Sequence, residues 1–138
     1  MATVLDLFAG CGGLSLGAKN AGFETALAID NDPALSSSFG RNFPASRHLL
    51  TDATQLDAKA LRRFLPNGVD GVIGGPPCQA FSEIGRRVPD DPRADLVRIF
   101  FRIVSNLQPS FFMMENVRGL IFPQNRPVLD ESLELLGG

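Results

Sequence analysis

TVLDLFAGCGGLSLGAKNAGFETALAI, residues 3–29, contains two apolar runs separated by a glycine-rich turn and a short helical pattern. The run at residues 3–8 is typical of a strand buried on both faces of a parallel sheet, and residues 25–29 predict a second strand. The apolar residues between them fall at helical spacing, at Leu14, Leu16, Ala18 and Ala21. Gly22 stands where a C′ glycine would end this helix. The segment therefore predicts one β-α-β unit.

The same alternation of strands and helices continues along the chain. Asp32, followed by a proline, predicts the N-cap of a helix that runs through about Phe39, and residues 47–50 predict a third strand. Asp57 predicts the cap of another helix, and residues 69–73 predict a fourth strand. The β-α pattern therefore repeats beyond the first unit.

A longer amphipathic pattern precedes the last predicted strand. Its apolar residues are Leu96, Val97, Phe100, Ile103, Val104 and Leu107. Residues 111–114, FFMM, predict a fifth strand, and a helix beginning near Pro127 would leave that strand at the edge of the sheet. Five strands with crossover helices predict a doubly wound, mainly parallel α/β sheet.

Length and composition favour a single soluble domain. With 138 residues, 44% of them hydrophobic, the chain has the size of one globular core. The sequence shows no secretory leader and no apolar run of about 18 residues, so we expect a cytoplasmic protein without a membrane span. Two cysteines and one histidine form neither a disulfide framework nor a metal-ligand cluster, so we expect no metal.

The charge balance argues against tight DNA binding by this chain alone. Thirteen basic and fifteen acidic side chains give a net charge of −2. Domains that bind nucleic acid by themselves usually carry a basic excess.

Glycines and acidic residues follow successive predicted strands. In open α/β sheets, ligands bind beyond the carboxyl ends of the strands. We therefore expect the turn at residues 10–13, Asp30 and Asp52 to lie close together at this edge of the sheet. Asp30 lies 18 residues after Gly12, near the spacing at which an acid binds ribose hydroxyls. The pyrophosphate-binding fingerprint would need glycine at Ser15, which favours an adenosine ligand without phosphates over a nicotinamide dinucleotide. The alternative interpretation is that the glycines only turn the chain and that both aspartates cap helices.

Three motifs, taken together and in this order, resemble those of the DNA (cytosine-5) methyltransferases. They are DLFAGCGG at residues 6–13, GPPCQAFS at residues 75–82 and ENV at residues 115–117. The resemblance implies the Rossmann-like fold of S-adenosylmethionine-dependent methyltransferases and S-adenosylmethionine as cofactor. It implies that the cofactor-binding residues are Phe8, Ala9, Gly10, Cys11, Gly12, Gly13, Asp30, Asn31, Asp52, Ala53, Gly75, Pro77 and Leu96.

The resemblance also implies the catalytic roles. The Cys78 thiolate would add to C6 of cytosine and make C5 nucleophilic, which is covalent catalysis. Glu115, as a protonated carboxyl in a desolvated site, would bond to N3 of the ring, with Asn116 positioning it. The target base must leave the duplex, so residues 79–95 form a candidate lid. The candidate contacts to double-stranded DNA are Gln79, Ser82, Arg86 and Arg87.

Taken alone, some of these residues have plainer interpretations. A cysteine after two prolines is more often an ordinary buried thiol, and Arg86 and Arg87 could be a solvated pair. We also expect His48 at the surface.

Parts of the family pattern are not found in this sequence. The resemblance implies a later Arg-x-Arg motif, a target-recognition region and a returning last segment, none of which residues 1–138 contain. We therefore expect a partial, C-terminally incomplete catalytic domain, cut short or completed by a second polypeptide. The alternatives are an RNA cytosine-5 methyltransferase, a non-catalytic S-adenosylmethionine-binding remnant and, less well supported, an NAD-binding module.

Overall fold

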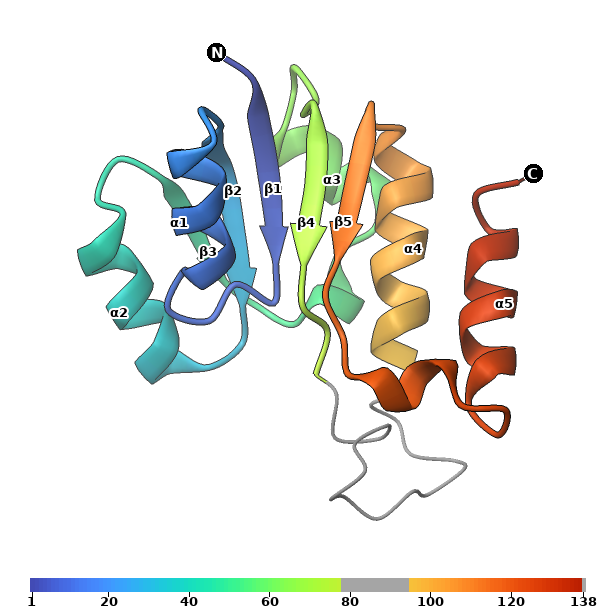
Figure 1. The fold of residues 1–138 in the computed structure, drawn as a ribbon. Helices are drawn as coiled ribbons and strands as arrows, with labels where there is room; N and C mark the ends of the chain where they lie inside the picture. Colours follow the sequence, from blue (N-terminus) through green and yellow to red (C-terminus); the bar gives the residue numbers. More distant parts are fainter. Residues whose placement is uncertain (78–94, 138) are drawn as a thin grey trace.

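The computed structural model, which describes residues 1–77 and 95–137, contains one five-stranded sheet (Figure 1). Its strands are β1 (Thr3–Leu7), β2 (Glu24–Asp30), β3 (Arg47–Leu50), β4 (Gly71–Gly74) and β5 (Phe111–Met114). All neighbouring pairs are parallel, in the order β3-β2-β1-β4-β5. The order reverses at β1, so the five predicted strands and the doubly wound α/β fold are confirmed.

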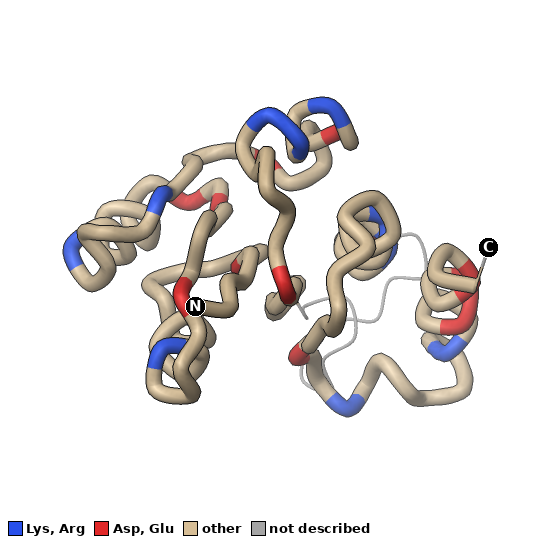
Figure 2. The backbone as a smooth tube through the Cα atoms, turned by 90° about the horizontal axis from the view of Figure 1, so that it is seen from above, with Lys and Arg blue, Asp and Glu red and all other residues tan. Residues whose placement is uncertain are grey.

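Helices cover both faces of the sheet. They are α1 (Gly13–Asn20), α2 (Pro33–Asn42), α3 (Ala58–Phe64), α4 (Asp95–Leu107) and α5 (Arg126–Glu134), with short 3-10 helices at Ala53–Gln55 and Arg118–Ile121. Figures 1 and 2 show α1 and α2 on one face, α3 and α4 on the other, and α5 packed outside α4. Charged residues lie mainly on these helices and at strand ends (Figure 2). Within the described residues, no helix is long and apolar enough to span a membrane.

The main hydrophobic core lies between the sheet and α4. The strands supply Leu5, Leu7, Leu27, Ile29 and Val72, and α4 supplies Val97, Phe100, Phe101, Ile103 and Val104. The helical pattern predicted for α4 is therefore confirmed. A smaller cluster on the opposite face joins Ala9, Ala28 and Phe39.

Three of the predicted helix ends are confirmed. The Asp32 carboxylate accepts hydrogen bonds from the backbone N–H groups of Ala34 and Leu35, and the Asp57 carboxylate accepts one from Ala60. Gly22 follows α1 with a φ of +94°, a left-handed conformation that glycine adopts without strain.

The predicted apolar stripe of α1 is not its buried face. Leu16 is 52% exposed, Ala21 is exposed, and the buried residue of this helix is Ser15. Three residues of the stripe, Leu14, Ala18 and Ala21, instead border an open apolar hollow of about 260 Å³, which β4 and β5 also line. On this face of the sheet, α1 covers β1 and β2, whereas the described residues place no helix over β5.

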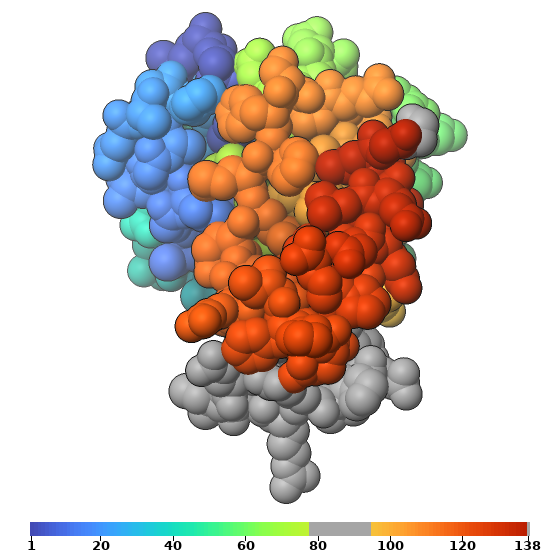
Figure 3. Space-filling view, turned by 45° about the vertical axis from the view of Figure 1, so that its right-hand side comes forward, coloured from blue at the N-terminus to red at the C-terminus, as the bar shows by residue number. Residues whose placement is uncertain are grey.

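Strand β5 forms one edge of the described sheet. Phe111 and Met113 point to the open face, with 37% and 49% of their surfaces exposed. The Phe111 ring lies across Gly71 of β4 and meets Phe23 edge-on, with the ring centroids 5.4 Å apart. In Figure 3 the orange atoms of this region lie at the surface beside the blue N-terminal segment.

Candidate functional site

The turn after β1 has an unusual backbone. Phe8, Gly10 and Gly12 have φ values of +58°, +57° and +105°. A Cβ atom on Gly12 would lie 2.2 Å from the Phe43 ring, so both the conformation and the space require glycine there. Phe8 is an aromatic residue in the left-handed region, which is rare and concentrates at functional sites.

Asp30 fixes this turn from the end of β2. Its Oδ2 accepts a hydrogen bond from the backbone N–H of Gly10 at 2.8 Å, and its Oδ1 accepts one from Asp32 at 2.8 Å. The backbone N–H of Ala9 also donates to the Ile29 carbonyl at 2.9 Å. Both carboxylate oxygens therefore have fixed positions, with further lone pairs available to a ligand.

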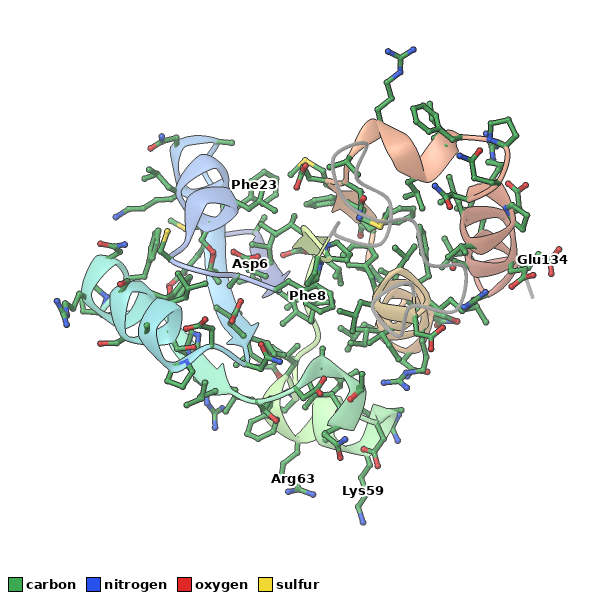
Figure 4. All side chains as sticks on the ribbon, turned by 90° about the horizontal axis from the view of Figure 1, so that it is seen from below. Asp6, Phe8, Phe23, Lys59, Arg63 and Glu134 are labelled. Carbon is green, nitrogen blue, oxygen red and sulfur yellow. The ribbon has the colours of Figure 1, made fainter. Side chains whose placement is uncertain are left out.

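A cavity of about 250 Å³ lies beyond the carboxyl ends of β1, β2 and β3. Its lining residues are Phe8, Ile29, Asp30, Asn31, Thr51, Asp52, Ala53, Thr54, Pro77 and Leu96. Figure 4 shows Phe8 at this end of the sheet. Aromatic and aliphatic walls with two carboxylates match the chemistry of an adenosine, whose base needs an apolar slot and whose hydroxyl and amino groups need acceptors.

The cavity gathers seven of the thirteen predicted cofactor residues. These are Phe8, Asp30, Asn31, Asp52, Ala53, Pro77 and Leu96. The other predicted residues, Ala9, Gly10, Cys11, Gly12, Gly13 and Gly75, are not among those that line it. Sequence reasoning missed Ile29, Thr51 and Thr54, although each lies next to, or two residues from, a predicted acid.

Asp52 combines two of the interpretations considered from the sequence. It caps the Ala53–Gln55 helix by accepting a hydrogen bond from the backbone N–H of Thr54 at 2.9 Å, and it also lines the cavity. Because Oδ1 accepts the capping hydrogen bond, the orientation of the carboxylate is fixed, and Oδ2 remains available as an acceptor.

The ends of β4 and β5 bring residues 74–76 next to residues 115–117, at the two predicted catalytic motifs. The backbone N–H of Glu115 donates to the Gly74 carbonyl at 2.9 Å. The Asn116 side-chain amide donates to the Pro76 carbonyl at 3.3 Å, and its Oδ1 accepts from Val117 at 2.8 Å. Asn116 therefore ties the segment that leads to residue 78 to the strand that carries Glu115.

Glu115 itself is exposed, so the described residues do not supply the desolvated surroundings that the resemblance implies. Its Oε2 lies 3.0 Å from the position that a Cβ on Gly75 would take, which places the carboxylate directly over that glycine. The predicted residues Cys78, Gln79, Ser82, Arg86 and Arg87 lie outside the described residues. Pro77, which precedes Cys78, lines the cavity.

His48 is not the surface residue that the sequence suggests. It is half-buried on β3, with its ring 5.2 Å from that of Phe39, and burial lowers its pKa. It lies outside the lining of the cavity.

The solved structures similar to this chain indicate its class. A DNA modification methyltransferase encoded within a prophage of E. coli has a TM-score of 0.89 and 41% sequence identity, and the match covers 100% of this chain and 38% of that one. The fold is therefore that of the methyltransferases.

Sequence comparison narrows this class. The family profile of the C-5 cytosine-specific DNA methylases matches residues 2–137, and the chain belongs to that family. It is 43% identical over 133 residues to the Type II methyltransferase M.XorII of Xanthomonas oryzae and 45% identical over 143 residues to M1.HphI of Haemophilus parahaemolyticus. These matches cover 94% and 98% of this chain, and 31% and 38% of the relatives. The chain thus spans about a third of the length of these relatives.

Proposed function

We propose that this chain is the part of a DNA cytosine-5 methyltransferase that binds S-adenosylmethionine and carries the nucleophile. The cavity carries this proposal, because Phe8, Asp30 and Asp52 surround an adenosine-sized space whose wall includes Pro77. Asp30 is the acceptor for the ribose hydroxyls, and Asp52 for the adenine amino group. S-adenosylmethionine, when bound there, supplies an electrophilic methyl group.

The reaction proposed for the chain's own residues starts at Cys78. Its thiolate forms a bond to C6 of a flipped-out cytosine, and the electron pair moved into the ring makes C5 the nucleophile. The Glu115 carboxyl donates a hydrogen bond to N3 and favours this addition, after which C5 takes the methyl group. A base then removes the C5 proton, the electron pair re-forms the C5–C6 double bond, and the thiolate leaves.

Because Glu115 is exposed, the incoming base must itself exclude water from this carboxyl. The Asn116 side chain joins the segment that carries Glu115 to Pro76, two residues before Cys78 in the sequence. The named relatives are Type II methyltransferases, which favours double-stranded DNA as the substrate and restriction–modification as the setting.

We further propose that turnover needs a target-recognition region, carried by further residues of the same chain or by a second polypeptide. The matches cover 31% and 38% of these relatives, so most of each relative has no counterpart in residues 1–138. The open hollow between α1 and β5, lined almost wholly by apolar side chains, is the surface on which such a region would dock.

Two measurements on the 138-residue chain test the function. Calorimetric titration should show saturable binding of S-adenosylmethionine, and its absence from the folded chain would contradict the cofactor site. Duplex DNA containing 5-fluorocytosine should form a covalent adduct with the chain when both S-adenosylmethionine and a complementing polypeptide are present, and Cys78→Ser should form none.

The complementing polypeptide is the part of M.XorII that lies beyond its match to this chain. Methylation by residues 1–138 without any complement would refute the requirement for a target-recognition region. Cofactor binding without an adduct under any condition would support a non-catalytic remnant, and transfer to tRNA in place of DNA would support the RNA enzyme.

A further inference from the structure

Three buried polar side chains from three elements form a hydrogen-bonded chain beneath the glycine-rich turn. The Ser15 hydroxyl donates to Asp6 Oδ2 at 2.5 Å, and the Thr25 hydroxyl donates to Ser15 Oγ at 2.9 Å. Asp6, Ser15 and Thr25 are 0%, 1% and 6% exposed. Figure 4 shows Asp6 between β1 and α1, behind Phe8. The chain therefore joins β1, α1 and β2 inside the protein.

This hydrogen-bonded chain closes the base of the turn. Residues 7–14 lie between Asp6 and Ser15, and they include the three residues with positive φ. The middle of the same turn is held by the bond from Gly10 to Asp30. A backbone in sparsely populated conformations persists only where its surroundings hold it, and these two aspartates provide those restraints from two strands.

Helix α1 has no side chain of its own to hold its start. Its N-cap is Gly12, which offers no side-chain acceptor. Ser15 lies in the first turn of the helix, so its bond to Asp6 fixes the helix start to β1. Asp6 thus supplies from a neighbouring strand an anchor that most helices obtain from their own N-cap residue.

The arrangement is costly for a purely structural element. Oδ1 of Asp6 is buried and has no hydrogen-bond partner among the residues that the structure describes, and burial of the carboxylate opposes its ionisation. Apolar side chains of the same shape would fill this space at lower cost. The presence of a carboxylate at this buried position is therefore better explained by its hydrogen bond to Ser15, which fixes the orientation of that side chain, than by packing.

We propose that Asp6 is a positioning residue that, through Ser15 and Thr25, holds residues 8–13 in the conformation that presents Phe8 and Asp30 to the cofactor. Asp6 does not line the cavity, so it acts only through these neighbours. This inference rests on the proposed function, because it takes S-adenosylmethionine as the ligand of the cavity.

The first test compares cofactor affinity with stability. Ser15→Ala removes both side-chain hydrogen bonds and Thr25→Val removes one. Both variants should weaken S-adenosylmethionine binding tenfold or more at a temperature where the proteins are fully folded. Ser132→Ala is the matched control, because the Ser132 hydroxyl is equally buried and bonds to Val128 in α5, away from the turn. It should lower the unfolding temperature and leave the affinity unchanged.

A double-mutant cycle separates positioning from general destabilisation. If Asp6 acts through Ser15, Asp6→Asn combined with Ser15→Ala should bind the cofactor no more weakly than the weaker single variant. Ser15→Thr, which keeps the hydroxyl, should restore most of the affinity. Equal losses in the Ser132→Ala control, or additive losses in the cycle, would overturn the proposal.

A ligand-free measurement keeps this inference distinct from the proposed function. The backbone N–H groups of Gly10 and Gly12 bond to Asp30 and Ala9, so their NMR shifts and hydrogen-exchange rates report the turn directly. Thr25→Val should speed their exchange several-fold, and the control should not. Unchanged exchange and affinity would refute the positioning role, whereas faster exchange in a chain that binds no S-adenosylmethionine would refute only the cofactor assignment.

Discussion

The backbone N–H of Gly10 points at Oδ2 of Asp30 from 2.8 Å away, so the turn after β1 and the end of β2 form one rigid wall of the cavity. The other oxygen of this carboxylate is held by the backbone N–H of Asp32. Asp30 therefore shapes the wall, in addition to the role of ligand acceptor that we propose for it.

Replacing Asp30 should remove both contributions. Asp30→Ala should weaken S-adenosylmethionine binding by about tenfold to a hundredfold, the range expected for a lost charge-assisted hydrogen bond. The affinity of Asp30→Asn should lie between those of wild type and Asp30→Ala. Its single amide oxygen can accept from only one of the two N–H groups that the two carboxylate oxygens bind in wild type. Calorimetric titration measures the change. Asp57→Ala, which loses a cap on α3 away from the cavity, is the control, and an equal loss of affinity there would contradict the assignment.

Asp6 should make stability depend on pH. Burial raises its pKa from 3.8 to about 6, although the Ser15 hydrogen bonds favour the ionised form. The folded chain therefore binds this proton more tightly than the unfolded chain, and the stabilisation present below about pH 4 is lost as the pH rises through 6. Asp6→Asn, which cannot ionise, should gain about 2 kcal/mol relative to wild type between pH 4.5 and 7.5.

Urea unfolding at the two pH values measures this difference. The comparison with Asp6→Asn cancels the contribution of His48, whose lowered pKa acts in the opposite direction. A difference that stays constant with pH would show that Asp6 titrates normally.

Gly74 should tolerate no side chain. A Cβ atom there would lie 2.6 Å from the carbonyl oxygen of Leu7 on the paired strand and 3.0 Å from the Phe100 ring. Gly74→Ala should therefore destabilise the fold by about 2 kcal/mol or more, as overpacking in a core does. Gly17→Ala is the matched control. Apart from α1's own backbone, no atom of the described residues lies within 4 Å of an added Cβ, and α1 should gain up to about 1 kcal/mol. Thermal unfolding distinguishes the two.

A charge on the open face of β5 should prevent complementation. Met113→Lys places an ammonium group in the apolar hollow, so methylation with the complementing polypeptide should fall at least tenfold while S-adenosylmethionine binding stays unchanged. Leu16→Lys is matched to it, because Leu16 is 52% exposed against 49% for Met113 and does not line the hollow. Activity equal in both variants would place the partner elsewhere.

Local patterns predicted most of this fold. The strands are short apolar runs. Asp32 and Asp57 cap the starts of helices by hydrogen bonds within three residues, and Gly22 follows the end of α1. The sequence also predicted that the acids after β2 and β3 would meet, because parallel strands bring their carboxyl ends to one edge.

The buried face of α1 could not be predicted in this way. Helical periodicity marks leucines and alanines as the buried stripe, yet the residue that is buried is Ser15. Its partner, Asp6, comes from another element nine positions away, and a tertiary hydrogen bond leaves no periodic signal. The same holds for Thr51 and Thr54, which enter the cavity only because of how the chain turns after β3.

The boundary between β1 and β4, which pair in parallel, separates two halves of the sheet for which we propose different roles. β2 and β3 lead to the cofactor acids, while β4 and β5 lead to Cys78 and Glu115. The two halves meet along one seam, where Leu7 pairs with Gly74 and adjacent strands lie about 4.8 Å apart. In the proposed mechanism, this seam fixes the spacing between the methyl donor and the acceptor base. Loops on either side could then change what is recognised without changing the distance of the proposed methyl transfer.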